Sequence, residues 1–208
     1  MNNTDWLSIA KRLQALAQAG LAYSQSGYDL ERYQEISEIS VDILHRLTEE
    51  PIEKIAPLFT ERFGYQTPKS DIRAVIFNDD HKILMVKEKI DGRWALPGGW
   101  ADIGHTPSEV AVKEVMEETG LEVTVERLLA VLDKKCHPHP PEPWYVYKFF
   151  VLCKKTGGEI SRETNETSEI AYFGLEELPP LSEVRNTFSQ LELMFEFHKN
   201  PAKEVILD

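Results

Sequence analysis

The chain has 208 residues, of which 42% are hydrophobic and 28% are charged. This balance is typical of a globular protein of one or two domains, and it disfavours disorder along the whole chain. Asp and Glu outnumber Lys and Arg by 35 to 23, which gives a formal net charge of −12. So acidic a chain repels polyphosphate backbones and anionic membranes in general, although carboxylates could hold divalent cations, and those cations could hold phosphate.

The two cysteines, Cys136 and Cys153, are too few for a disulfide framework or a zinc ligand set. The N-terminus lacks the pattern of a signal peptide, because charged residues interrupt it early. No apolar run approaches the ~20 residues that a membrane span needs. We therefore expect a cytoplasmic protein that has free thiols and no membrane segment.

Residues 1–66 are expected to form a small all-helical N-terminal domain. Apolar residues spaced three and four apart predict a first helix, which Gly20 and residues 24–27 weaken or end. A second helix is predicted over 29–47, and a third from Pro51 to about Gly64. So small a unit leans on a neighbour for stability, so it is either a packing or dimer module or a domain that borders the active site and narrows substrate choice. We expect a homodimer.

Residues 67–70 are interpreted as a linker, and 71–208 as a second domain in which strands mix with a few helices. This mixture indicates an α/β or α+β fold. A hairpin turn is predicted at 156–158, after a strand, and a final helix at 183–198. The remaining predicted strands cover 72–77, 83–86, 123–132 and 145–153.

The most informative segment predicts a helix over about 107–119. Thr106 can cap it, Glu109 can complete a capping box, and Gly120 is a natural stop. On a helical wheel one arc holds Ala111, Val112, Val115 and Thr119, and a neighbouring arc holds Glu114, Glu117 and Glu118.

The three carboxylates on adjacent turns repel one another, and a hard cation such as Mg²⁺ or Mn²⁺ would remove the conflict. An ordinary solvated acidic face is the alternative. The preceding Gly98-Gly99 turn allows the backbone to approach a ligand closely, which makes the cation site the better interpretation.

The segment resembles the Nudix box, Gly-x5-Glu-x7-Arg-Glu-U-x-Glu-Glu-x-Gly-U, in which U is aliphatic. Two positions depart from it, because His105 stands for the early Glu and Lys113 for the Arg. Lys113 cannot make the planar fork of Arg, although it can still neutralise a neighbouring Glu. The positions that match are Gly99, Glu114, Val115, Glu117, Glu118, Gly120 and Leu121.

The resemblance implies an α/β/α sandwich with a mixed sheet, and hydrolysis of a phosphoanhydride in a nucleoside diphosphate linked to another group. One to three Mg²⁺ or Mn²⁺ ions would activate a water. We expect the metal ligands to be Glu114, Glu117, Glu118 and Gly98, with Glu117 and Glu118 also catalytic. The helical part resembles the N-terminal extension of a bacterial Nudix subgroup that includes CDP-choline and ADP-ribose pyrophosphatases.

Residues outside the box are further candidates. Glu166 and Glu169 lie in an acidic stretch that is either an exposed polar loop or the source of a general base. The Pro-rich loop 136–145 is either a rigid surface loop or a wall of the substrate pocket. The candidate substrate-binding residues are Arg73, Arg93, Gly99, His137, His139 and Tyr145.

We expect a small-molecule nucleotide substrate, and resemblance to the subgroup favours CDP-choline, giving CMP and phosphocholine. ADP-ribose, giving AMP and ribose 5-phosphate, is the first alternative. A non-catalytic nucleotide-sensing regulator is an alternative of another class. Trimming of RNA 3′ ends, and nucleic-acid binding in general, are disfavoured by the acidic charge.

Overall fold

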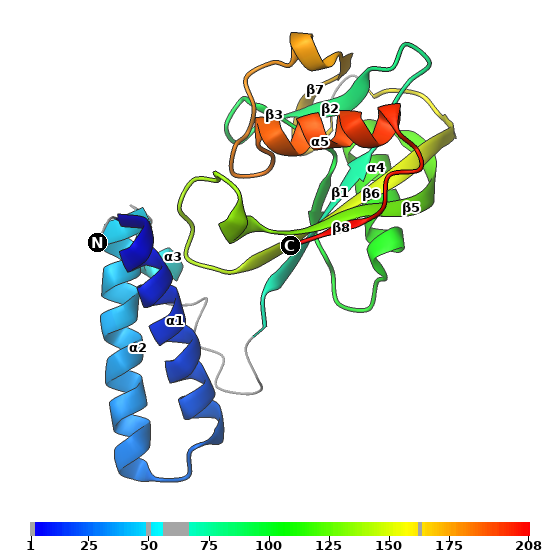
Figure 1. The fold of residues 1–208 in the computed structure, drawn as a ribbon. Helices are drawn as coiled ribbons and strands as arrows, with labels where there is room; N and C mark the ends of the chain where they lie inside the picture. Colours follow the sequence, from blue (N-terminus) through cyan, green and yellow to red (C-terminus); the bar gives the residue numbers. More distant parts are fainter. Residues whose placement is uncertain (1–2, 49–50, 56–66, 162–163) are drawn as a thin grey trace. The chain divides into compact units, whose positions relative to one another are not determined.

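The computed structural model describes residues 3–48, 51–55, 67–161 and 164–208 (Figure 1). The chain divides into two units. One contains residues 1–68 together with 141–145, and the other contains residues 69–140 and 146–208. In the described ranges no helix is long and apolar enough to cross a membrane, and both cysteines are free.

The first unit is helical, with α1 (Asn3–Tyr23), α2 (Gly27–Thr48) and α3 (Ile52–Ile55). Figure 1 shows α1 and α2 as two neighbouring, antiparallel helices. Their small core contains Ala10 of α1, Leu44 of α2 and Ile55 of α3. The expected continuation of the third helix to about Gly64 falls on residues 56–66, outside the described ranges.

The prediction that Gly20 weakens or ends the first helix was wrong, because α1 continues to Tyr23. A Cβ atom at position 20 would lie 2.4 Å from the ring of Tyr33 on α2. The glycine therefore allows the two helices to approach closely, and the tertiary contact outweighs its low helix propensity.

The second unit contains two sheets. A five-stranded sheet has the order β4-β1-β6-β5-β8, in which β1 runs parallel to β6 and β5 runs antiparallel to it. A three-stranded antiparallel sheet has the order β3-β2-β7. The strands are β1 (Lys69–Val75), β2 (Ile83–Glu88), β3 (Trp94–Ala95), β4 (Gly98–Trp100), β5 (Leu121–Asp133), β6 (Val146–Gly158), β7 (Thr167–Phe173) and β8 (Ile206–Leu207).

Two helices, α4 (Pro107–Thr119) and α5 (Phe188–Lys199), cover opposite sides of these strands (Figure 1). Val110, Ala111 and Val115 of α4 pack with one set of strand residues, including Ile72 and Val151. On the other side, α5 packs with a second set that spans both sheets. The expected α/β/α sandwich with a mixed sheet is confirmed. Two short 3₁₀ helices, η2 (Lys134–Cys136) and η3 (Leu175–Glu177), complete the unit.

Three local predictions in this unit were wrong. Residues 156–158 do not turn into a hairpin, because β6 continues through Gly158, which pairs with Leu121 of β5. Lys69 and Ser70, expected in the linker, pair with β6 as the first residues of β1. Val112, expected in the apolar stripe of α4, is 36% exposed, and Val110 is buried in its place.

The last helix begins at Phe188, five residues after the predicted start at Glu183. The residues in between make other contacts. The Ser182 N–H donates to the Trp94 carbonyl, the Trp94 N–H donates to the Pro180 carbonyl, and the Asn186 side chain accepts from the Leu96 N–H. Tertiary contacts therefore hold 182–186 out of the helix.

Candidate active site

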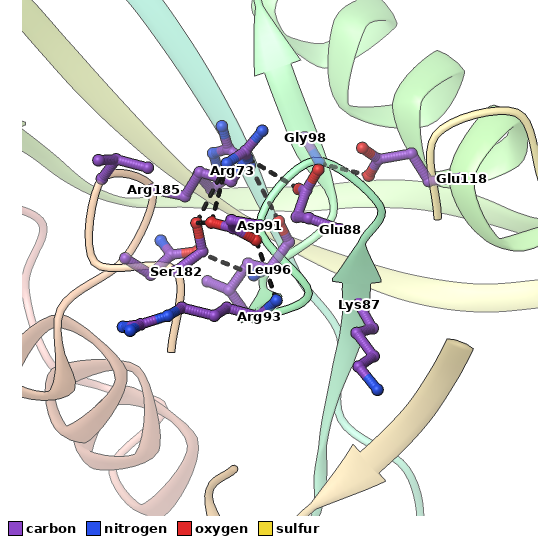
Figure 2. Close-up of polar contacts among 12 residues, drawn as sticks. Arg73, Lys87, Glu88, Asp91, Arg93, Leu96, Gly98, Glu118, Ser182 and Arg185 are labelled. Atoms are coloured by element: carbon purple, nitrogen blue, oxygen red, sulfur yellow. Dashed lines mark hydrogen bonds and ion pairs between the residues drawn. The ribbon is translucent and has the colours of Figure 1, made fainter. Parts of the chain in front are cut away.

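The capping box places α4 as the sequence predicts. Thr106 accepts from the Glu109 N–H, the Glu109 carboxylate accepts from the Thr106 N–H, and Gly120 ends the helix with a φ of 75°. The adjoining turn needs Gly98, whose φ is 142° and whose Cβ would meet the Ile72 carbonyl oxygen at 2.0 Å. Helix and turn meet where the Gly98 N–H donates to Glu118 Oε2 at 2.8 Å (Figure 2).

Glu118 is the most deeply buried carboxylate of the box, with 4% of the residue exposed. Its pKa is raised to about 8, chiefly by burial and also by the neighbouring Glu88 and Glu114, although Arg73 and the Gly98 N–H oppose this. The α4 helix thus holds a carboxylate whose charged form is disfavoured, because the nearby positive charge does not offset the effect of burial.

The other two box glutamates differ in exposure. The Glu114 side chain is 14% exposed and that of Glu117 is 58% exposed. Burial raises the pKa of Glu114, and Glu117 and Glu166 add to this effect while Lys113 opposes it. Gly99 allows the close approach of Glu114, because a Cβ there would lie 3.2 Å from the carboxylate.

Lys113 takes the position of the usual Arg and lies among these acids. Its Nζ is 3.1 Å from Asp102, 3.3 Å from Glu117 and 3.8 Å from Glu114. Hydrogen bonds to Asp102 and Glu117 raise the pKa of Lys113. The expectation that it neutralises a neighbouring glutamate is confirmed.

Glu166 approaches the box helix from the loop before β7. The Glu166 carbonyl accepts from the Lys89 N–H, and the next residue, Thr167, donates its hydroxyl to the Glu118 carbonyl at 2.9 Å. The exposed Glu166 carboxylate raises the pKa of both Glu88 and Glu114. Glu169, by contrast, pairs with Lys87 Nζ at 2.6 Å across β2 and β7. The structure therefore brings Glu166, but not Glu169, to the box glutamates.

Two residues of the site were missed from the sequence. Glu88, at the end of β2, is 5% exposed, and its Oε1 is 2.8 Å from Nε of Arg185. Burial raises the pKa of Glu88, Arg185 and Arg73 oppose this, and Asp91 and Glu166 reinforce it. The sequence did offer a signal for Glu88, because this acidic residue follows closely after the apolar run of a predicted strand. Arg185 lies in a predicted helix, so its sequence context gave none.

Arg73 lies beneath this cluster and is 5% exposed. Its guanidinium donates to Asp71 Oδ1 at 2.9 Å and to the Leu96 carbonyl at 3.1 Å. Burial raises the pKa of Asp71, but the charges of Arg73 and of the fully buried Lys148, which also contacts it, outweigh this and lower it to about 2. The guanidinium of Arg73 is therefore a buried positive charge, held in place by its contacts, that interacts with Glu88 and Glu118.

The remaining candidates lie elsewhere. Arg93 is exposed, donates to the Leu181 carbonyl, and in Figure 2 points away from the cluster around Glu88. His137 contacts Asp208, and His139 contacts the Glu183 carbonyl and Gln190. Burial lowers the pKa of His139 to about 3.

Tyr145 belongs to the helical unit, where its ring centre is 4.2 Å from Nζ of Lys11. The contacts of His137, His139 and Tyr145 give no support to a shared substrate pocket.

The arrangement fits a divalent cation. Over the described ranges, no three His, Cys, Asp or Glu side chains are already gathered closely enough to hold an ion. However, burial raises the pKa of both Glu118 and Glu114, and neighbouring carboxylates add to this, Glu88 and Glu114 for Glu118 and Glu117 and Glu166 for Glu114. Hard carboxylate oxygens suit Mg²⁺ or Mn²⁺, and an ion would remove the repulsion between them.

Two domain families match the chain. Residues 67–193 match the NUDIX domain, and residues 4–59 match a domain described as UDP-X-like, N-terminal oligomerisation domain. The chain therefore belongs to the Nudix family. It is a Nudix pyrophosphohydrolase, an enzyme that acts on phosphorus-containing anhydrides, and enzymes of this family generally use divalent metals.

Three relatives illustrate the similarity. The putative ADP-ribose pyrophosphatase YjhB of Bacillus subtilis (strain 168) is 46% identical over 206 residues, which cover 99% of this chain and 98% of that protein. The solved structure of a UDP-X diphosphatase is 32% identical with a TM-score of 0.64, covering 99% of this chain and 100% of the other. The structure of an ADP-ribose pyrophosphatase from Streptococcus suis 89-1591 is 44% identical with a TM-score of 0.62, covering 68% and 100%.

Proposed function

We propose that the chain hydrolyses the pyrophosphate bond of a nucleoside diphosphate linked to another moiety, using Mg²⁺ or Mn²⁺. The observation that carries the proposal is the position of Glu118. It is a buried carboxylate with a pKa raised to about 8, anchored by the Gly98 N–H and surrounded by further acids. Such a carboxylate is costly to bury unless a cation compensates it.

In this proposal each residue has a distinct role. Glu114 and Glu118, with Gly98 in the adjoining turn, would hold the cation, and Glu117 would add a carboxylate at the exposed rim. A cation bound there would neutralise phosphate charge and lower the pKa of a bound water. Glu166 accepts the proton of the attacking water, since its carboxylate interacts with Glu88 and Glu114. Glu169 is the weaker candidate for this base, because Lys87 already pairs with it.

ADP-ribose is the first substrate to test, giving AMP and ribose 5-phosphate. The relatives named for ADP-ribose support this choice, and the structure named for UDP-X supports a uridine diphosphate conjugate as the second. CDP-choline, which the subgroup resemblance favours, stays in the panel but has no support from a named relative above. Gly99, which lies beside Glu114, remains a candidate for a substrate contact, whereas the contacts of Arg93 and of loop 136–145 do not support that role.

The test is to incubate the purified protein with ADP-ribose, UDP-glucose, CDP-choline and a short RNA, and to identify products by mass spectrometry. We expect nucleoside monophosphate to appear with Mg²⁺ or Mn²⁺ and to disappear with EDTA. Metal-dependent turnover of the RNA alone, or no turnover of any conjugate with either metal, would contradict the proposal.

We propose further that the helical unit forms a homodimer. The domain family that matches residues 4–59 is described as an oligomerisation domain, and several large apolar side chains of α1 and α2 are exposed, among them Leu16, Tyr28 and Ile39. Light scattering should give twice the chain mass of 23.9 kDa. A single-chain mass at micromolar concentration would contradict the dimer.

A further inference from the structure

Arg185 lies directly beside the acidic cluster without belonging to the box. It comes from the segment 181–187, between η3 and α5, and its side chain is 24% exposed. Nε is 2.8 Å from Glu88 Oε1, and Nη1 is 3.1 Å from Ser182 Oγ, which itself donates to Asp91 Oδ2 at 2.6 Å. Figure 2 shows these residues gathered around the guanidinium.

These contacts fix only part of the guanidinium fork. The contacts above use Nε and Nη1, and the structure gives no hydrogen bond or ion pair from Nη2 to any of the residues that it describes. An arginine whose side chain is already held in place loses little conformational entropy when its remaining donors meet an anion. Planar donors of this kind match phosphate oxygens.

The charges around Arg185 are mixed. Arg73 and Arg185 lower the pKa of Glu88, whereas Asp91 and Glu166 raise it. A phosphate that approaches Nη2 therefore meets the positive charge of two arginines as well as the negative charge of the carboxylates.

A second donor in the same segment also lacks a partner. Asn186 is fully buried, and its Oδ1 accepts from the Leu96 N–H at 2.8 Å. Among the described residues, its Nδ2 has no hydrogen-bond partner. A buried donor without an acceptor costs about 1–3 kcal/mol, so it is retained where something else supplies the acceptor. Two adjacent residues thus carry unused donors next to the cluster.

We propose that Arg185 is a substrate-binding residue, whose free guanidinium edge holds a non-bridging oxygen of the substrate's diphosphate, and that Glu88 is the positioning residue that holds Arg185 for this contact. The inference rests on the proposed function, because it assumes that a diphosphate lies at the box glutamates. It assigns a role to the segment 181–187 that neither the box nor the matched families name.

A structural role for the same ion pair makes a different prediction. If Arg185 only ties the segment to β2, its removal lowers the melting temperature and the fraction of active protein, but leaves the Kd and KM of the remaining protein unchanged. If Arg185 binds phosphate, Kd and KM rise, and the affinity for a ligand without phosphate stays the same. The two roles are separable with one set of variants.

The experiment uses the full chain with Mg²⁺ and titrates α,β-methylene-ADP, which carries an uncleavable diphosphate, and adenosine, by calorimetry. Arg185→Gln removes the charge, Arg185→Lys keeps it without the fork, and Glu88→Gln weakens the hold on Arg185. Arg127→Gln is the matched control, because Arg127 is a part-buried arginine that donates to the Lys203 carbonyl and lies over the Phe197 ring. Kinetics on a hydrolysed conjugate give kcat and KM separately.

We expect Arg185→Gln to weaken binding of the methylene analogue about tenfold to a hundredfold, the scale of one hydrogen bond to a charged group. Arg185→Lys and Glu88→Gln should fall in between, and Arg127→Gln and all adenosine affinities should match the wild type. If Arg185→Gln does not fold, Arg185→Lys carries the same test. A Kd for the analogue within twofold of wild type in the folded Arg185 variant would overturn the inference.

Failure of the proposed function and failure of the proposed Arg185 contact would give different experimental results. If the wild type hydrolyses no conjugate but Arg185→Gln still weakens the analogue, the proposed function fails and the diphosphate contact stands. If the wild type hydrolyses a conjugate and Arg185→Gln matches it in kcat, KM and Kd, only the contact fails.

Discussion

The helices α4 and α5 begin with the same local motif, yet only one of them could be placed from the sequence. Both have a capping box, formed by Thr106 and Glu109 in α4 and by Thr187 and Gln190 in α5. Pro107 marks the start of α4 in the sequence, whereas a run of helix-compatible residues precedes Thr187 and hides the start of α5.

The difference between the two helices shows where contacts with residues distant in the sequence outweigh the local signals for a helix start. The residues before α4 form an exposed turn whose contacts are mostly local, such as that of Asp102 with Lys113. The residues before α5 hydrogen-bond to Trp94 and Leu96 and form an ion pair with Glu88, and all three partners are remote in sequence. The hidden helix start therefore coincides with the segment that we infer to bind substrate.

The largest effect is expected at α4, from Glu118→Gln. The amide can still accept from the Gly98 N–H, but it removes a charge that the metal needs, so kcat should fall on the order of 10²–10³-fold. Steady-state kinetics with Mg²⁺ measure this. Glu192→Gln, which changes an exposed carboxylate on α5, is the matched control. Unchanged metal-dependent turnover in Glu118→Gln would remove the assigned metal site.

Asn186→Ala tests the segment before α5. It leaves the buried Leu96 N–H without an acceptor, which should lower the free energy of unfolding by about 1–3 kcal/mol. Removal of the unpartnered Nδ2 offsets part of this cost. Urea unfolding measures the change, with Asn200→Ala at the exposed end of α5 as control. An effect below that of the control would mean that the hydrogen bond does not hold the segment.

Thr106→Ala and Thr187→Ala compare the two caps directly. Each should cost about 1 kcal/mol, the typical value for an N-cap. We expect the larger loss for Thr187, because it is 4% exposed and its hydroxyl also contacts Ser189. Denaturant unfolding of both variants, and of the Thr→Ser versions that keep the hydroxyl, checks this. Equal losses would show that the caps act only locally.

The last prediction concerns pH. The pKa of His139 is lowered by burial to about 3 from its ordinary value of 6.5, so the native state favours the neutral ring. The unfolded state therefore binds more protons below pH 6.5, and this contribution to stability, complete above pH 6.5, is lost as the pH falls toward 3.

The measurement is the unfolding free energy of wild type and His139→Gln between pH 7 and 4, a range that lies above the pKa of Asp71. The difference between the two proteins should shrink as the pH falls. A difference that stays constant over this range would contradict a neutral, buried His139.

The part of the candidate site that could be predicted from the sequence is its local part. Thr106, Pro107 and Gly120 set the ends of α4, and the spacing of the three glutamates puts them on one side of it. The exposure of Glu117, the burial of Glu118 and the exchange of Val112 for Val110 depend on how α4 is rotated against the sheet. A helical wheel gives relative directions only.

The sequence by itself determined the α4 helix, the glycine turn before it and the family to which they belong, because each depends on residues within a few turns of one another. Only the tertiary structure decided that Glu88 lies near Glu118, that Arg185 pairs with Glu88, and that Glu166 rather than Glu169 lies near Glu114. Glu88, Glu166 and Arg185 come from three separate segments, and such contacts follow from how the sheets and helices pack. No spacing along the chain encodes that arrangement.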